Sequence, residues 1–170
     1  VRDAGSFSYA INSHELDTFS GTQGHSTVQF DDRDQMPKLS RFLFGNWLKP
    51  LDIYFNGKDN FVSSGYKDQN ENTHTRKVRE IEKGWQIIDV INGEFKSAIF
   101  RWILKPGNWE VKNKSISSEN TTIEFQSNQT FELQLNESFE SLHYMEKTIV
   151  PVLEIDLQFN GIFKTNILFK

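Results

Sequence analysis

After residue 70, apolar and polar side chains alternate in short runs, and this period of two predicts β-strands rather than helices. The run from Trp85 to Ile91 is a clear example, and it ends at Asn92-Gly93, a dipeptide that favours a hairpin turn. We therefore expect Ser97 to Leu104 to be the returning strand, and a second hairpin at Asn160-Gly161 between the last two strands. Further strands are expected over residues 121–125, 130–135, 150–159 and 164–169.

Residues 1–70 are less regular and contain more loops. Thr27 to Phe30 and Leu51 to Phe55 are candidate strands, and His14 to Phe19 is a candidate for one helical turn. The chain shows no internal repeat and no linker. Short strands at this spacing predict an all-β fold, an antiparallel β-sandwich that forms one domain over residues 1–170.

The composition agrees with this fold class and excludes several kinds of function. Fifteen Phe, four Trp and four Tyr suit pleated, half-buried surfaces. The formal net charge of -4 comes without long charged runs, so we expect no binding to nucleic acid or to an anionic membrane surface. No apolar stretch approaches the roughly 20 residues that a membrane-spanning helix requires. The chain has no Cys, which excludes disulfides, thiolate zinc ligands and a thiol nucleophile.

Two N-terminal segments carry the candidate chemistry, Asp3 to Tyr9 and Thr22 to Val28. An Asp and a His brought together from separate strands are two of the ligands that a zinc site needs. However, Asp is also a common turn former, and a lone strand His is commonly a hydrogen-bonded structural residue. The sequence starts at Val1 without an initiator Met or a signal peptide, and we interpret it as truncated on its N-terminal side.

Several short motifs follow these segments in order along the chain. Asp31 to Gln35 reads Asp-Asp-Arg-Asp-Gln, and it is followed by His74-Thr75-Arg76, Phe100 to Pro106, Ser141 to Lys147 and Val150 to Leu153. Together with the two N-terminal segments, these motifs resemble the C-terminal β-sandwich of heparinase II/III-like polysaccharide lyases. The corresponding family patterns are Asp-Pro/Ala-Gly-Thr-Tyr-x-Tyr, Thr-x-x-His-Asn-Thr-Val, Asp-Gly-x-Asp-Gln, His-x-Arg, Phe-x-x-x-Pro, Ser-x-x-Tyr-x-x-Lys and Pro-Val-Leu. The resemblance covers nearly the whole chain.

The resemblance implies an architecture and a reaction. Family members join an N-terminal (α/α) toroid to a C-terminal β-sandwich, so this chain is expected to be the sandwich without its first strands and without the toroid. Their reaction is β-elimination on uronate-containing glycans, in which a base removes the proton α to the uronate carboxylate and an acid protonates the leaving glycosidic oxygen. The base and the acid come from the toroid, so catalytic residues within this chain stay unknown.

The expected partners follow from the same resemblance. They are an acidic polysaccharide or oligosaccharide and the missing toroid, and the expected location is the bacterial periplasm or cell surface. Whether the parent protein is an active lyase stays open, while the fragment alone is expected to be inactive.

The resemblance also implies a structural zinc site. Its ligands would be Asp3, His25 and a His from a His-x-His strand upstream of this chain. The sequence departs from the family pattern at Thr18 and Ser20, where a Tyr and an Arg are usual, and at Ser26, where an Asn is usual. A sandwich Tyr near this place takes part in catalysis in some relatives, so its absence argues against that mode of chemistry.

The other histidines are weaker candidates. His14 is expected in a loop, where it either faces the cleft or is simply solvated. His74 is expected on a solvated face together with its charged neighbours in residues 76–80. His143 stands next to Tyr144, and neighbouring residues on a strand point to opposite faces, so a structural role is expected for His143 as well.

A second class of function stays open, that of a non-catalytic carbohydrate-binding or bracing domain of a lyase-like protein in surface-polysaccharide metabolism. Sugars stack on aromatic rings, so Tyr9 and the four Trp residues are candidates for sugar contact. Trp85 and Trp102 fall in alternating strands and are expected in the core. Trp47 and Trp109, near turn residues, are expected to be exposed.

Asn-x-Ser/Thr sequons start at Asn113, Asn120, Asn128 and Asn136. This motif is frequent by chance in Ser- and Asn-rich stretches. We interpret these asparagines as polar turn residues and solvent-facing strand positions.

Overall fold

The computed structural model describes residues 1–8, 13–40, 42–58 and 60–170, and the side chains of residues 13–16 are outside this description. Nearly all of its regular structure is antiparallel β, which confirms the expected fold class. Two short helical segments precede the first strand, α1 (Ser13–Ser20) and η1 (Thr22–Gly24). The strands are β1 (Val28–Phe30), β2 (Lys38–Ser40), β3 (Leu43–Phe44), β4 (Lys49–Pro50), β5 (Tyr54–Asn56), β6 (Phe61–Lys67), β7 (Thr73–Ile81), β8 (Gly84–Asn92), β9 (Ala98–Ile103), β10 (Glu110–Lys112), β11 (Ser115–Ser117), β12 (Thr121–Ser127), β13 (Gln134–Glu140), β14 (Thr148–Leu157) and β15 (Gly161–Phe169).

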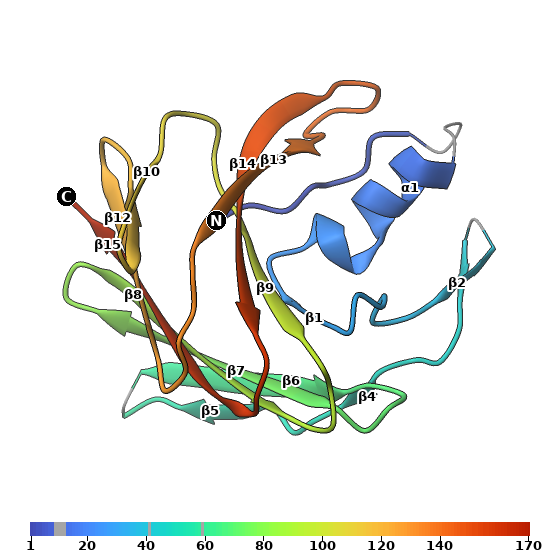
Figure 1. The fold of residues 1–170 in the computed structure, drawn as a ribbon, viewed down its shortest axis with the longest axis horizontal. Helices are drawn as coiled ribbons and strands as arrows, with labels where there is room; N and C mark the ends of the chain where they lie inside the picture. Colours follow the sequence, from blue (N-terminus) through green and yellow to red (C-terminus); the bar gives the residue numbers. More distant parts are fainter. Residues whose placement is uncertain (9–12, 41, 59) are drawn as a thin grey trace.

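The strands form two sheets that pack face to face. The smaller sheet has the order β1-β9-β14-β13. The larger sheet has the order β10-β11-β12-β15-β8-β7-β6-β4, and β5 pairs with β6. A separate hairpin of β2 and β3 lies outside both sheets. Figure 1 shows β6 and β7 along the bottom of the view, with β9 and β14 rising above them.

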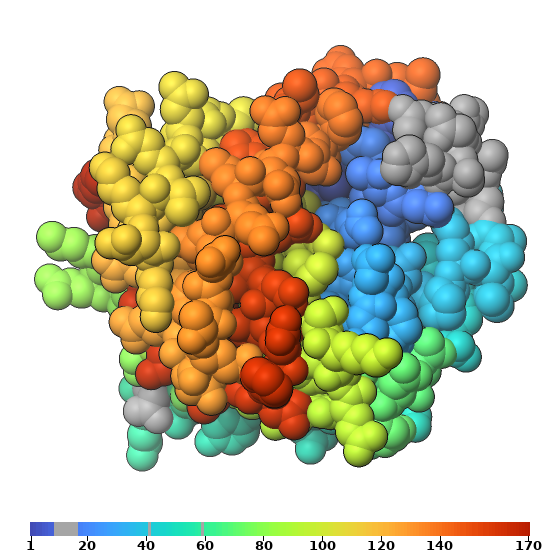
Figure 2. All heavy atoms as spheres, in the orientation of Figure 1, coloured from blue at the N-terminus to red at the C-terminus, as the bar shows by residue number. Residues whose placement is uncertain are grey.

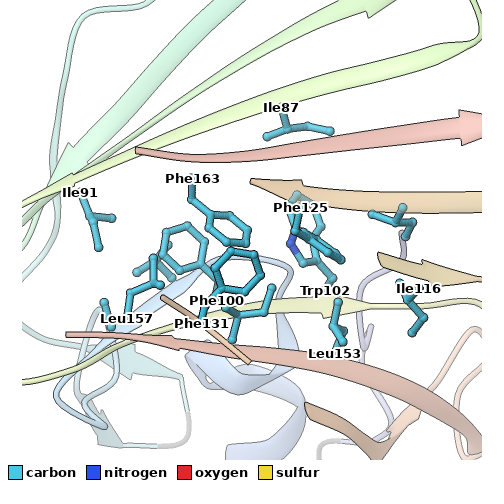
Figure 3. Packing of buried hydrophobic residues seen from close by; sticks show 14 of the residues in the cluster. Ile87, Ile91, Phe100, Trp102, Ile116, Phe125, Phe131, Leu153, Leu157 and Phe163 are labelled. Atoms are coloured by element: carbon cyan, nitrogen blue, oxygen red, sulfur yellow. The ribbon is translucent and has the colours of Figure 1, made fainter. Parts of the chain in front are cut away.

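The core lies between the two sheets and is built from alternate strand positions. On β14, Leu153 and Ile155 face inward with no exposed surface. Phe100 of β9 meets Phe163 of β15 across the interface with ring centroids 4.9 Å apart, and Figure 3 shows these rings at the centre of the cluster. Full burial of each such side chain contributes roughly 1.5–3 kcal/mol, so this aromatic layer and the aliphatic side chains around it hold the two sheets together.

The N-terminal segment and α1 cover part of the outer face of the smaller sheet. Ala4 and Phe19 pack there against Ile103, Val150 and Val152, and these residues form a second apolar cluster. β14 is therefore buried on both faces at this end, which explains why Val152 and Leu153 are both buried although they are neighbours in the sequence. This cluster fixes the N-terminal segment to the sandwich.

Both predicted Asn-Gly hairpins are wrong. β8 pairs with β7 and β15, whereas β9 pairs with β1 and β14, so residues 93–97 cross from one sheet to the other. Asn160-Gly161 likewise connects β14 of the smaller sheet to β15 of the larger one. The two turns meet, since the Gly93 N–H donates a hydrogen bond to Asn160 Oδ1 at 3.0 Å. β8 instead forms a hairpin with the strand before it, β7, where Ile81 pairs with Gly84.

Some strand limits also differ from those expected. The strand predicted over 130–135 is β13, which starts only at Gln134 and runs to Glu140. β13 is an edge strand and most of its residues are exposed, so its sequence carries little alternation. β2, β3, β4, β6, β10 and β11 were not expected. Among the residues described, no helix is long and apolar enough to cross a membrane.

Candidate functional site

The structure brings the two predicted metal ligands together. His25 Nδ1 and Asp3 Oδ2 lie 2.6 Å apart, a hydrogen-bonding distance. Both side chains are partly open to solvent, with 46% of His25 and 58% of Asp3 exposed. The other carboxylate oxygen, Asp3 Oδ1, accepts a hydrogen bond from the Gly5 N–H at 3.0 Å. The carboxylate is thus oriented from both sides.

Ser26 is the residue that holds the two segments in place. Its hydroxyl donates to the Arg2 carbonyl at 2.9 Å and accepts from the Ile103 N–H at 3.0 Å. A backbone hydrogen bond from Ala4 to Gly24, 2.9 Å long, joins the segments a second time. Ser26 follows His25 and Arg2 precedes Asp3, so these bonds set the separation of the candidate ligands.

A buried ionic cluster lies behind Ser26. The Arg76 guanidinium donates to the Ser26 carbonyl at 2.7 Å and to Asp89 Oδ1 at 2.6 Å. His74 Nε2 lies 2.7 Å from the same Asp89 oxygen. Arg76 also sits over the Trp102 ring, 4.7 Å from its centroid. These contacts link the core of the larger sheet to the Asp3–His25 pair.

Asp89 stays ionised in this cluster although it has no exposed surface. Burial by itself would raise the pKa of Asp89, but the hydrogen bond from His74 and the charge of Arg76 outweigh burial and leave that pKa lowered. Sequence reasoning gave Asp89 no role. The available signal was a single carboxylate inside the apolar run from Ile87 to Ile91.

The expectation that His74 lies on a solvated face is wrong. Only 4% of His74 is exposed, because its ring packs edge-on against Tyr66 and Phe100. Its charged neighbours Arg79 and Glu80, farther along β7, are exposed as expected. The hydrogen bond with Asp89 offsets the free-energy cost of burying a polar ring at this position.

The loop over residues 31–35 folds beneath the His25 segment. Asp34 Oδ1 accepts a hydrogen bond from the Thr22 N–H at 2.7 Å, and Thr22 Oγ1 accepts one from the Gln35 N–H at 2.8 Å. The Gln35 side-chain amide donates to the Tyr66 hydroxyl at 2.8 Å. Burial raises the pKa of Tyr66, so this phenol stays protonated and does not suit the role of a catalytic base.

A pocket of about 410 Å³ lies beside the Asp3–His25 pair. The pair lines one part of it, and Phe7, Phe19 and Phe42 line another. The Phe7 and Phe19 rings stack at 5.7 Å. A pocket with an apolar wall and a few polar groups is the usual form of a small-molecule site.

The segment over residues 141–147 braces the wall of this pocket. The Ser141 N–H donates to the Ala4 carbonyl at 2.7 Å, and the Met145 N–H donates to the Phe7 carbonyl at 2.8 Å. The Lys147 ammonium lies 4.2 Å from the centre of the Phe7 ring. His143 is exposed and lies in this loop rather than on a strand, so the strand argument for its orientation does not apply.

The pair satisfies part of what zinc requires. Imidazole nitrogen and carboxylate oxygen are suitable donors, which bind zinc at about 2.0–2.2 Å, and a tetrahedral site needs at least three protein ligands. No group of three His, Cys, Asp or Glu side chains that could hold a metal ion occurs among the described residues. Asp3 and His25 therefore supply two suitable donors, one fewer than the three protein ligands of a zinc site.

The remaining sugar-contact candidates are placed as follows. Trp102 is buried and Trp47 is 75% exposed, both as expected. The expectations for the other two Trp residues are wrong, because Trp85 is 44% exposed and Trp109 packs against the core. Tyr9 lies outside the described residues.

The remaining predicted positions lie in helices, turns and strands. The candidate helical turn over His14 to Phe19 is confirmed by α1, so His14 does not lie in a loop, and its side chain is not described. Among the sequon residues, Asn113 occupies a turn with a φ of 51°. The side chain of Asn128 accepts a hydrogen bond from the Ile162 N–H at 3.2 Å, and that of Asn136 donates to Glu154 at 2.7 Å.

The chain is similar in sequence and in fold to known proteins. A family profile described as heparinase II/III-like, C-terminal, matches residues 1–156. Among solved structures, the heparinase III-BT4657 gene product superposes with a TM-score of 0.75 at 15% identity, covering 99% of this chain and 28% of that one. A heparan sulfate lyase, HepC from Pedobacter heparinus, superposes with a TM-score of 0.72 at 17% identity, covering 100% of this chain and 28% of that one.

A further structure of heparinase III gives a TM-score of 0.71 at 12% identity, covering 98% of this chain and 26% of that one. At these identities the structures establish the shared fold, and this chain spans little more than a quarter of their length. No curated protein matches the sequence.

Proposed function

This chain belongs to the heparinase II/III-like C-terminal domain family, and on that premise we propose that its Asp3–His25 pocket forms one wall of the substrate cleft of a polysaccharide lyase. The observation that carries the proposal is the 2.6 Å contact of Asp3 with His25 beside a pocket that has an apolar wall. The two residues come from separate segments, and a buried network anchors them through Ser26.

We propose that the parent protein cleaves uronate-containing glycans by β-elimination. In this reaction the C5–H bond and the C4–O bond break, the C4=C5 double bond forms, and the leaving oxygen takes up a proton. The part of this chain is to bind and orient the acidic glycan against Phe7 and the exposed Phe42, while the base and the acid come from the toroid. The heparan sulfate lyase with the same sandwich fold supports this substrate class. Action in the bacterial periplasm or at the cell surface belongs to the same proposal.

We also propose a structural zinc ion held by Asp3, His25 and a His from a strand upstream of residue 1. Bound there, the ion would act as a crosslink between the N-terminal segment and the turn around His25. The support for it is the donor chemistry of the pair and its solvent access.

Elemental analysis of the parent protein, purified without chelator or affinity metal, tests this proposal. We expect near-stoichiometric zinc, and we expect both Asp3→Ala and His25→Ala to lose most of it, because two remaining ligands hold zinc weakly. His143→Ala is the matched control, since His143 is an exposed loop His and is expected to leave the zinc content unchanged. Zinc that is absent from the parent, or retained in both variants, would contradict the zinc site and favour a hydrogen-bonded structural pair.

A second candidate is a non-catalytic domain that binds glycan or braces its neighbour. The exposed rings of Phe42 and Trp47, 71% and 75% accessible, favour it because they offer apolar surface near the pocket. Glycan binding by the parent without release of unsaturated uronate would support this candidate over the lyase.

A further inference from the structure

A second pocket, of about 540 Å³, lies where the β12–β13 connection meets the end of β14. It shares no residue with the Asp3–His25 pocket. In Figure 2 the orange residues around 130 and the red residues that follow β14 lie next to each other on the face turned to the viewer. Gln129, Glu132, Gln134, Asp156 and Phe159 are among the residues that line it.

Phe159 presents its ring to solvent from a backbone that is held firmly. Phe159 is 69% exposed. The Gln129 side chain clamps its peptide groups, because Gln129 Oε1 accepts from the Phe159 N–H at 3.2 Å and Gln129 Nε2 donates to the Phe159 carbonyl at 2.5 Å. Asn128 Oδ1 accepts from the Ile162 N–H at 3.2 Å and fixes the same turn. An exposed ring on a preorganised backbone loses little freedom when a ligand stacks on it.

The floor of this pocket is also rigid. Phe131 is only 8% exposed and meets Phe163 of the core edge-on, with ring centroids 5.4 Å apart. The pocket is therefore anchored to the aromatic layer between the two sheets.

The polar lining of the pocket carries negative charge and hydrogen-bonding groups. Glu132 and Asp156 supply two carboxylates, and Gln134 and Gln158 supply amides that both donate and accept. All four residues are exposed. No Lys, Arg or His occurs among the described residues that line the pocket. The Lys114 ammonium lies 5.0 Å from the centre of the Phe131 ring, but the two carboxylates still outnumber this cation, so an anionic ligand would meet net repulsion.

We propose that this pocket is a binding site for a neutral saccharide. The apolar C–H face of a pyranose would stack on the Phe159 ring, and its hydroxyls would exchange hydrogen bonds with the amides and carboxylates. The two carboxylates select against the acidic sugars that the proposed cleft takes. The site therefore differs in residues and in ligand charge from the Asp3–His25 pocket and adds a function to the domain.

Titration of the ¹⁵N-labelled chain with neutral hexasaccharides tests the proposal by NMR. Maltohexaose, cellohexaose and mannohexaose are the neutral probes, and a heparan sulfate hexasaccharide is the acidic one. We expect at least one neutral probe to shift the side-chain amide signals of Gln134 and Gln158, with a Kd of about 1 mM. Phe159→Ala should weaken this binding about tenfold, because the stacking surface is lost.

Phe55→Ala is the matched control, since Phe55 is 70% exposed but lies on β5, away from the pocket lining. It should bind the neutral probe like the unaltered chain. The proposal is overturned if no neutral probe shifts these amides at about 10 mM. It is equally overturned if only the heparan probe shifts them, or if Phe159→Ala and Phe55→Ala behave alike. Because Asp3→Ala should leave this binding unchanged, failure here is distinct from failure of the proposed cleft.

Discussion

Asp89 is the carboxylate at the centre of the buried ionic cluster behind Ser26. It is fully buried, and its carboxylate pairs with the His74 ring and with the Arg76 guanidinium. Arg76 in turn donates to the Ser26 carbonyl, one residue from His25. A charge in the core of the larger sheet thereby helps to fix a candidate ligand at the surface.

We expect Asp89→Asn to lower the free energy of unfolding by about 3 kcal/mol at pH 7, because the substitution leaves the Arg76 charge without its buried partner. The pKa of Asp89 is lowered in the folded chain, so its contribution is fully present above the pKa of an unfolded Asp. The contribution is lost as the pH falls through the folded pKa. Urea unfolding at a series of pH values below 7 should therefore show a smaller acid-induced loss in Asp89→Asn.

Asp52→Asn is the control for this prediction. It removes the same negative charge, but from an exposed residue on the surface. It should shift the unfolding free energy by less than about 0.5 kcal/mol. Equal effects of the two substitutions would show that the Asp89 cluster adds nothing to stability.

At the residue scale, sequence identified the Asp3–His25 pair but not what holds it. The pair lies in two recognisable motifs, whereas its anchoring depends on Ile103 and Arg76, which are distant in sequence. The error at His74 has the same origin. The alternation of His74 with charged neighbours predicted that its side chain is exposed to solvent, but rings from two other strands bury it.

At the scale of elements, the N-terminal segment behaves as an additional strand-like piece. It bridges Arg2 to Ile103 on one side and Gly5 to Ser141 on the other. Gly5 has a backbone φ of 72°, a value that residues other than glycine rarely adopt. A Cβ atom at this position would also overlap the Ser141 carbonyl oxygen.

We expect Gly5→Ala to destabilise the fold by about 1–3 kcal/mol and to loosen the contact with Ser141. Hydrogen exchange of the Ser141 amide, which is bonded to the Ala4 carbonyl, should accelerate more than that of core amides. Gly107→Ala is the matched control, because Gly107 also has a positive φ, 138°, but no atom lies within 4 Å of its added Cβ. If both variants lose the same stability, the backbone conformation alone matters and the packing against Ser141 does not.

Strand positions were predicted better than strand pairing. β15 and the second half of β14, Leu153 to Leu157, largely follow their alternating runs, because one face of each is buried there. The Asn-Gly dipeptides at 92–93 and 160–161 indicated turns correctly, but a turn preference is local and does not tell whether the next strand stays in the same sheet. The partners of β8 and β14 are set instead by how the two apolar faces close on each other, which no local pattern records.

At the scale of the whole molecule, the two pockets differ in their charged groups, because the described lining of the first has one carboxylate, Asp3, beside His25, and that of the second has two. Lys147 stacks on Phe7 beside the Asp3–His25 pocket, whereas Glu132 and Asp156 line the second pocket. We propose an acidic glycan for the first pocket and a neutral saccharide for the second. A domain with both would hold an acidic chain in the cleft and a neutral saccharide at a separate place.

The isolated chain should not turn over substrate. β-Elimination needs a base that removes the proton from the uronate and an acid that protonates the leaving oxygen, both placed at the same glycosidic bond. Tyr66 packs against the core and accepts a hydrogen bond from the Gln35 amide, and its raised pKa keeps it protonated, so it does not supply the base. This chain also spans only 28% of a related lyase chain. With heparan sulfate or alginate, we expect no ultraviolet absorbance of unsaturated uronate from these 170 residues. The parent protein is the positive control. Clear product from the fragment would overturn this expectation. Loss of that product in His25→Ala would then assign the proton transfer to the exposed His25, oriented by Asp3.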